Sequence, residues 1–165
     1  MALYTHGNKN MTTPSQTNIT TSYTAAGHML SLTSATAGGP RRGYIYEFDV
    51  GTDNVPNSTD CSIAWDMSRQ STLGTGVATV IVPLDPAEAA SGMVGRGNYT
   101  IIPIITANSS VWSLAANQRA SYRWVVNPGG PGELVVPATD VNGLVIRALS
   151  TTYASTAMVQ MSFRE

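Results

Sequence analysis

The sequence predicts an all-β protein, folded as a two-sheet antiparallel β-sandwich of jelly-roll type with one short helix near residues 85–91. Three observations predict this class. β-Branched residues are abundant and helix-favouring ones scarce: Lys9 is the sole lysine, beside four glutamates. Roughly nine or ten short strand-like runs recur between turn residues. The helix-per-strand rhythm of an α/β fold is missing. An immunoglobulin-type sandwich is the main structural alternative.

The first 25 residues differ in pattern from the rest of the chain. They are polar and weakly periodic, so residues 1–25 are predicted to form an extended polar arm and residues 26–165 one β-sandwich domain. A chain of 165 residues buries roughly two-thirds of its unfolded surface without metal or disulfide staples. Cys61 is the only cysteine, and it is expected to pack as a small apolar residue. The opening MALYTHGNKNMTT predicts no secretory signal, and no apolar run reaches the length of a membrane span.

Strand-like runs begin at 28–34 and continue through RRGYIYEFDVG. There Tyr44, Tyr46, Phe48 and Val50 alternate with Ile45, Glu47 and Asp49, which places the two sets on opposite faces. The run VATVIVP at 77–83 is apolar on both faces and predicts a central strand. The other runs are 61–67, 99–106, 111–115, 120–126, 133–136, 144–149 and 154–163.

Three of these segments carry more specific predictions. Asp85 as cap, Pro86 at the first helical position and Glu88 three residues after the cap predict the short helix, ended by Gly92. Pro103 predicts an edge position or a bulge for 99–106. In the last run the inward face is predicted to consist of Ala157, Val159, Met161 and Phe163.

Residues that carry catalytic or metal chemistry are few. A hydrolytic triad needs a histidine; His6 falls in the predicted arm and His28 opens a strand, so neither favours a hydrolase. Two histidines and one cysteine far apart do not indicate zinc. Glu47, Asp49 and Asp53 lie close in sequence, but the strand alternation makes solvated carboxylates the expected finding. Asp49 with 53–54 is a possible calcium set that lacks the spacing of a known calcium loop. No cofactor is predicted.

The stretch NQRASYRWVVNPGGPGELVVPAT, 117–139, contains the Gly/Pro run 128–132. A phosphate-binding loop would open onto a helix, whereas this run leads into a strand and its prolines remove N–H donors. It therefore predicts a stiff corner between strands. Arg119 and Arg123 are expected either to anchor such a loop through its carbonyls or to face a partner.

The charge distribution argues against nucleic acid as a partner. Charged residues make up 12% of the chain and the net charge is −1, and the densest basic spot is Arg41–Arg42, with Arg96 alone in the GRG at 95–97. The first 25 residues hold no arginine, which also counts against a coat protein that condenses its own genome. Among the aromatics, Trp124 is expected to pack inside, whereas Trp112 and Tyr99 are candidates for an exposed sugar-stacking platform.

Residues 41–165 resemble a family of small tailed-phage and prophage virion proteins. The run NQRASYRWVVNPGG followed by GELVVPATDVNG is similar to that family's NQRA-x-(Y/F)-RW-V … ELV-x-PAT motif. Upstream, YIYEFDVGTDNVPNSTDCSIAWDMSRQSTLGTG and VPLDPAEAAS resemble its Y-D-(aliphatic)-x-x-G strand and its LDP turn. The segment 1–25 lies outside the resemblance.

The resemblance implies a non-enzymatic capsid decoration, or cement, protein. Such a protein is made in the host bacterial cytoplasm and sits on the capsid exterior, commonly as a homotrimer bound to the major capsid protein, without nucleic acid or membrane as partner. The alternative from another class is a receptor- or carbohydrate-binding module of a phage tail or fibre. Exposed aromatic side chains would favour the alternative, whereas little charge and a surface rich in Ser, Thr and Asn, suited to many weak contacts, are compatible with a decoration protein.

Overall fold

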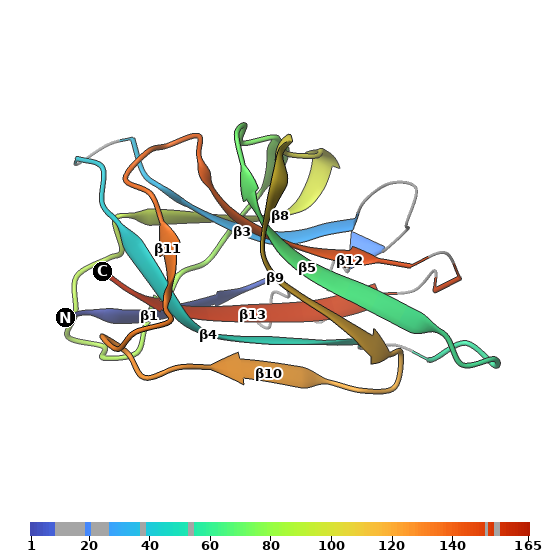
Figure 1. The fold of residues 1–165 in the computed structure, drawn as a ribbon. Helices are drawn as coiled ribbons and strands as arrows, with labels where there is room; N and C mark the ends of the chain where they lie inside the picture. The colour runs from blue at the N-terminus through green and yellow to red at the C-terminus, as the bar shows by residue number, and fades with distance from the viewer. Residues whose placement is uncertain (9–18, 21–26, 37–38, 53–54, 151, 154–155) are drawn as a thin grey trace.

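The computed structural model describes residues 1–8, 19–20, 27–36, 39–52, 55–150, 152–153 and 156–165. These residues form thirteen strands and no helix, arranged as two antiparallel sheets packed face to face (Figure 1). The predicted all-β, two-sheet sandwich is therefore confirmed. Many consecutive strands lie in opposite sheets, as from β3 to β4 and from β12 to β13; jelly-roll connectivity within the class stays a prediction.

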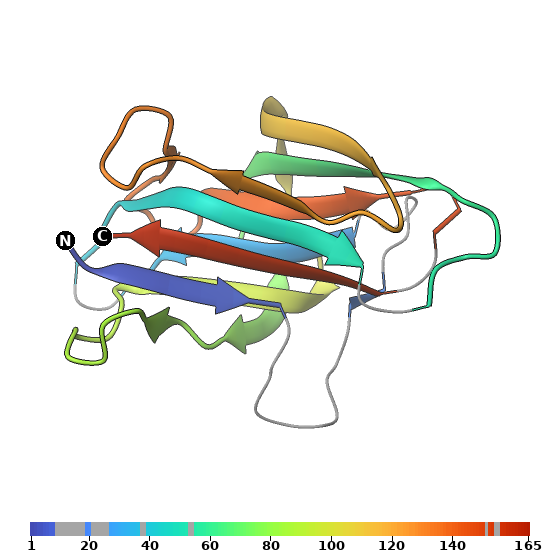
Figure 2. The same ribbon diagram turned by 90° about the horizontal axis from the view of Figure 1, so that it is seen from below.

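The first sheet has seven strands, and β4, β13 and β1 lie side by side at its centre (Figure 2). Its path is β10 (Tyr122–Val125), β4 (Gly43–Thr52), β13 (Thr156–Arg164), β1 (Leu3–Gly7) and β7 (Val82–Pro83), with β11 (Leu134–Val136) paired to β4 and β2 (Ile19–Thr20) paired to β13. The second sheet has six strands in the order β6 (Thr75–Thr79), β8 (Met93–Ile101), β3 (Gly27–Ser34), β12 (Gly143–Leu149), β5 (Ser62–Gln70) and β9 (Ile105–Asn117).

The core lies between the sheets and follows the predicted alternation on β13. All four residues predicted to face inward are buried: Ala157, Val159, Met161 and Phe163. On β4 the alternation is interrupted, because the register with β13 shifts between Ser162 and Phe163 and leaves Tyr46 without an opposite residue. Ile45 consequently turns into the same core as Phe48, although strict alternation placed them on opposite faces.

The chain start corrects the prediction of an extended arm over residues 1–25. Leu3–Gly7 forms β1, which pairs with β13 from Leu3↔Arg164 to Gly7↔Gln160 and with β7 on its other side. Tyr4 and His6 point into the core and are buried. The short run LYTHG alternates like a strand, but its partner lies more than a hundred residues away, so local composition alone hid the pairing. The rest of the predicted arm, 9–18 and 21–26, lies outside the described residues.

Two connections in the second sheet join its strands into one bent antiparallel ribbon. β5 pairs with β9 as far as Gln70↔Ile105, and β6 pairs with β8 from Thr75↔Ile101 onward. Between these ladders the Ser71 N–H donates to the Ile104 carbonyl at 2.9 Å. Gly74 at the bend has φ +63°, and a Cβ there would lie 2.4 Å from the Ile101 oxygen, so only glycine fits.

The ribbon also corrects three predictions about its segments. Residues 77–82 were predicted to be a central strand, but β6 is the edge strand of its sheet and β7 the edge strand of the other. Pro103 separates β8 from β9 instead of lying within one strand. No helix forms near 85–91: the Ala87 N–H donates to Asp85 Oδ1 at 2.9 Å and the chain makes a single turn. Its side chains are exposed, so a helix would have no apolar face to bury.

Candidate interaction surface

The histidine predicted to lie in the arm is a core residue. His6 Nδ1 lies 3.0 Å from Thr79 Oγ1, and the ring packs edge-on against Phe163 at 5.9 Å. Burial lowers the pKa of His6 to about 3, so the ring is neutral at physiological pH. His28 lies on β3 with its backbone opposite Arg147, and its side chain is outside the described part. The structure thus brings these two residues to different places.

Of the neighbouring carboxylates, Glu47 forms an ion pair and Asp49 is partly buried. Glu47 pairs with Arg123 of the adjacent strand β10. Burial raises the pKa of Asp49, and the nearby Glu47 charge adds to that effect. Asp53 lies outside the described residues. Within the described part of the chain, no group of three or more His, Cys, Asp or Glu side chains is placed to hold a metal ion.

Gln118, in the middle of the NQRA motif, fastens the loop at 55–61. Its side chain is completely buried, and its Nε2 donates to the carbonyls of Asn57 at 3.2 Å and Thr59 at 3.1 Å. Its Oε1 accepts the Asn57 N–H at 3.0 Å and the Cys61 thiol at 3.4 Å. Both donors and both lone pairs are therefore used, which makes Gln118 a structural clamp.

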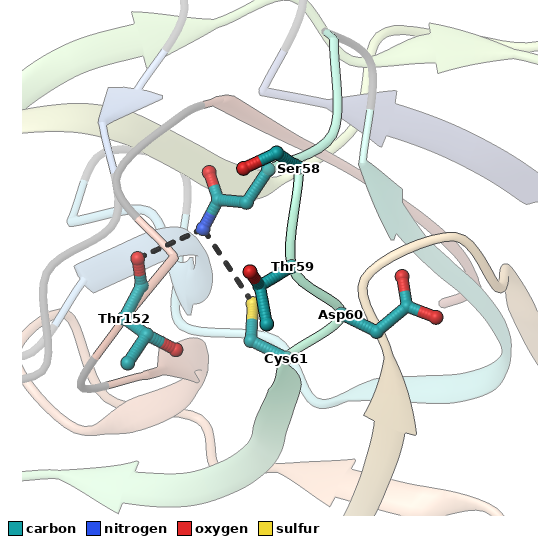
Figure 3. Close-up of a pocket in the computed structure, with 6 residues that line it drawn as sticks. Ser58, Thr59, Asp60, Cys61 and Thr152 are labelled. Carbon is teal, nitrogen blue, oxygen red and sulfur yellow. Dashed lines mark hydrogen bonds between the residues drawn. The ribbon is translucent and has the colours of Figure 1, made fainter.

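A polar pocket lies on this loop and is lined by Asn57, Ser58, Thr59, Asp60, Cys61 and Thr152 (Figure 3). Asn57 Nδ2 donates to the Thr152 carbonyl at 2.9 Å and also approaches Cys61 Sγ at 3.7 Å (Figure 3). Hydrogen bonds from Arg119 and Gln118 lower the pKa of Asp60, so this carboxylate is ionised and paired. The Cys61 thiol donates to the Gln118 side-chain amide, and the described residues that line the pocket include no histidine.

Of the two arginines of the motif, Arg123 pairs with Glu47 on β4 and Arg119 anchors a loop, although that loop is not the predicted Gly/Pro run. Arg119 donates to Asp60 Oδ1 at 2.7 Å and to the Asn57 carbonyl at 3.4 Å, so it anchors the 55–61 loop. The Gly/Pro run is held instead by Glu133, which accepts the Gly129 N–H at 2.8 Å and pairs with both Arg164 nitrogens, at 2.7 and 2.6 Å.

The backbone of the Gly/Pro run has the conformation predicted for a stiff corner. Gly129 and Gly132 have φ values of +81° and +100°, which side chains with a Cβ rarely adopt. The run bridges β10 and β11, which pair with successive parts of β4. The strongest ion pair that sequence reasoning missed lies elsewhere: Arg147 pairs with the buried Asp66 across β12 and β5.

The predicted aromatic platform is only partly exposed. Trp65 is buried in the core, and Trp124, which was predicted to pack inside, is partly buried against it. Trp112 packs edge-on against Phe48 at 4.8 Å and stacks on Tyr122 at 5.7 Å, at the side where β9 and β10 are the edge strands. Tyr99 is not a platform, because its hydroxyl bonds Ser31 on β3 and burial raises its pKa to about 12.

The most exposed apolar surface is the edge formed by β6, β7 and the ribbon bend. We call it the apolar edge; its side chains are Val77, Val80, Val82, Leu84, Ile101, Ile102 and Ile104. Their exposed fractions run from 45% to 74%. No charged residue occurs in 71–84 or in 97–118. Large exposed apolar patches of this kind mark protein-interaction sites.

Comparison with known proteins gives no match to a protein-family model, to a curated protein or to a solved structure. The described residues contain no helix long and apolar enough to cross a membrane. The candidate site therefore rests on the chain's own geometry, and that geometry points to a surface that contacts protein.

Proposed function

We propose that this chain is a non-enzymatic structural protein of a phage virion, a capsid decoration protein that binds and stabilises the lattice of the major capsid protein. The apolar edge is the observation that carries the proposal. A β-sandwich that presents seven exposed apolar side chains on segments 71–84 and 97–118, which hold no charged residue, is suited to broad, uncharged protein contacts. The resemblance of residues 41–165 to tailed-phage virion proteins supplies the class of partner.

Residues of the motifs that carry the resemblance, together with Arg164, hold two loops of this fold in place. Gln118 and Arg119 hold the 55–61 loop, while Glu133 and Arg164 hold the Gly/Pro run. Such residues preserve a rigid scaffold, and a decoration protein needs rigidity because it adds stability to the lattice only if it holds its own shape. On this proposal the protein is made in the bacterial cytoplasm and lies on the capsid exterior, with further copies of itself as neighbours.

Binding to purified capsids that lack the protein tests the proposal. We expect saturable binding, repeated density on the capsid exterior by cryo-EM and a higher capsid melting temperature; capsids of an unrelated phage serve as the control. Absence of binding to the cognate capsid contradicts the proposal. Deleting residues 1–25 is not a suitable test, because it removes β1 and with it the buried Tyr4 and His6.

A receptor- or carbohydrate-binding module is the second candidate, and the stack of Trp112 on Tyr122 favours it. Tyr122 is 38% exposed, so one ring face is open to a ligand. Glycan-array binding by the wild type that disappears in Tyr122→Ala would support this function. Tyr122 is the better position to change, since Trp112 also packs against the buried Phe48. No glycan signal is expected from a decoration protein.

A further inference from the structure

We infer that the apolar edge binds a second copy of this chain, with the β6 strands of the two copies side by side and antiparallel across a twofold axis. This inference names the partner at the surface on which the proposed function rests. Its own basis is the geometry of the edge, the charge distribution and the exposed area.

The sequence of β6 and its flanks lacks the residues that protect edge strands from pairing with another chain. β6 pairs with β8 on one side, and no described strand pairs with its other side. Natural edge strands are guarded by lysine, by inward charges or by proline within the strand. Here 71–84 contains no charge, and Pro83 comes only at the end, in β7. An uncharged edge strand with no described strand on its outer side is suited to accept another strand.

The absence of charge narrows the choice of occupant. A charged partner would lose solvation against this surface without gaining an ion pair, so the matching surface is itself apolar and uncharged. The opposite side of the sandwich does not fit this requirement, because its edge strand β10 carries Arg123, which is paired with Glu47 and largely exposed. The apolar edge of another copy does fit.

A twofold axis makes this surface complementary to itself. Val77 lies in the middle of the edge, with Ile101–Ile104 beyond the start of β6 and 80–84 beyond its end. Antiparallel pairing about Val77 places the bend of each copy against 80–84 of the other, as an isologous interface requires. Seven side chains, each about half or more exposed, offer an apolar area of the order that a standard interface buries, roughly 800 Å² per partner.

Mass measurement of the purified full chain in solution tests the pairing. We expect a species of twice the 17.4 kDa chain mass by light scattering and native mass spectrometry. The double variant Val77→Lys/Val80→Lys places two charges at the centre of the interface and should weaken association by about 100-fold or more. Both side chains are more than half exposed, so the folded monomer should keep its circular dichroism spectrum.

Val125→Lys is the matched control, because Val125 is also more than half exposed but lies on β10 at the opposite side. It should leave the dimer intact. A monomeric wild type, a trimer as the family resemblance implies, or a monomeric Val125→Lys would each overturn the twofold pairing. Capsid binding is scored separately: a dimer that does not bind capsids refutes only the proposed function, and a monomer that binds them refutes only the pairing.

Discussion

Replacing Gln118 by glutamate tests the role of the NQRA motif as a loop clamp. The change keeps the shape of the side chain but removes the Nε2 donor, which leaves the carbonyls of Asn57 and Thr59 facing a carboxylate. Each of the two lost hydrogen bonds costs roughly 1 kcal/mol, and the buried carboxylate left without donors from its former amide position costs about 1–3 kcal/mol more, so Gln118→Glu should lose about 3–5 kcal/mol at pH 7. For a chain of this length that is a fall in Tm of about 10 °C or more.

Urea unfolding followed by tryptophan fluorescence measures the loss, and Gln118→Met is the comparison. Methionine fills a similar volume without a charge but removes the Oε1 acceptor as well as the donors, so its cost should be roughly 4 kcal/mol and independent of pH. Below pH 5, where a protonated glutamate regains one donor, Gln118→Glu should recover part of its loss and Gln118→Met should not. The clamp is refuted if Gln118→Glu unfolds within about 0.5 kcal/mol of the wild type, which is the range of an ordinary surface substitution.

Three further substitutions probe the buried charges and the corner. Burial lowers the pKa of His6 from 6.5 to about 3, so between these pH values the unfolded chain binds a proton that the folded chain does not. Stability should therefore fall by about 1.4 kcal/mol per pH unit as the pH drops from about 6.5 to 3. In urea titrations, His6→Gln should lose this slope. Arg147→Met leaves Asp66 charged and buried and should cost about 3 kcal/mol, of which adding Asp66→Asn should restore a large part; no restoration would show that the ion pair is not the cause. Gly132→Ala forces a Cβ into a φ of +100° and should lower stability by about 1–3 kcal/mol in thermal unfolding, whereas the exposed Pro131 tolerates alanine; equal effects would argue against the strained corner.

The sequence predicted best where the local pattern carries the packing information. On β13 the alternation of Val159, Met161 and Phe163 identified the buried face, because β13 itself keeps the alternation and the register shift beside Phe163 is taken up by the extra residue on β4. The positive φ values of the corner glycines were predicted for the same reason, since tolerance of φ above zero is a property of glycine itself. The two-sheet class followed from many such short patterns.

Features that depend on distant partners were not predictable from local pattern. Tyr4 and His6 looked like part of a polar arm, because the strand that buries them lies at the other end of the chain. Gln118 stood in a recognisable motif, but its four contacts reach back to 57–61 and only the fold brings them together. The helix predicted after Asp85 does not form, because the residues there carry capping signals but no apolar face that a helix could bury.

The prediction of a central strand at 77–82 was wrong for a different reason, which bears on function. The pattern of these residues is apolar on both faces and therefore predicted a central strand, yet in the single chain they form an edge with Val77 and Val80 exposed. The mismatch between pattern and exposure is therefore the clearest sign of an interaction surface that this sequence contains.

Cryo-EM of the phage particle whose genome encodes this chain tests the proposed function most directly. If the chain is a decoration protein, the reconstruction will show two-sheet sandwiches of this fold repeated over the outside of the capsid, in contact with the major capsid protein. Particles whose capsid surface lacks this fold, or that carry it only at the tail, would contradict the proposal.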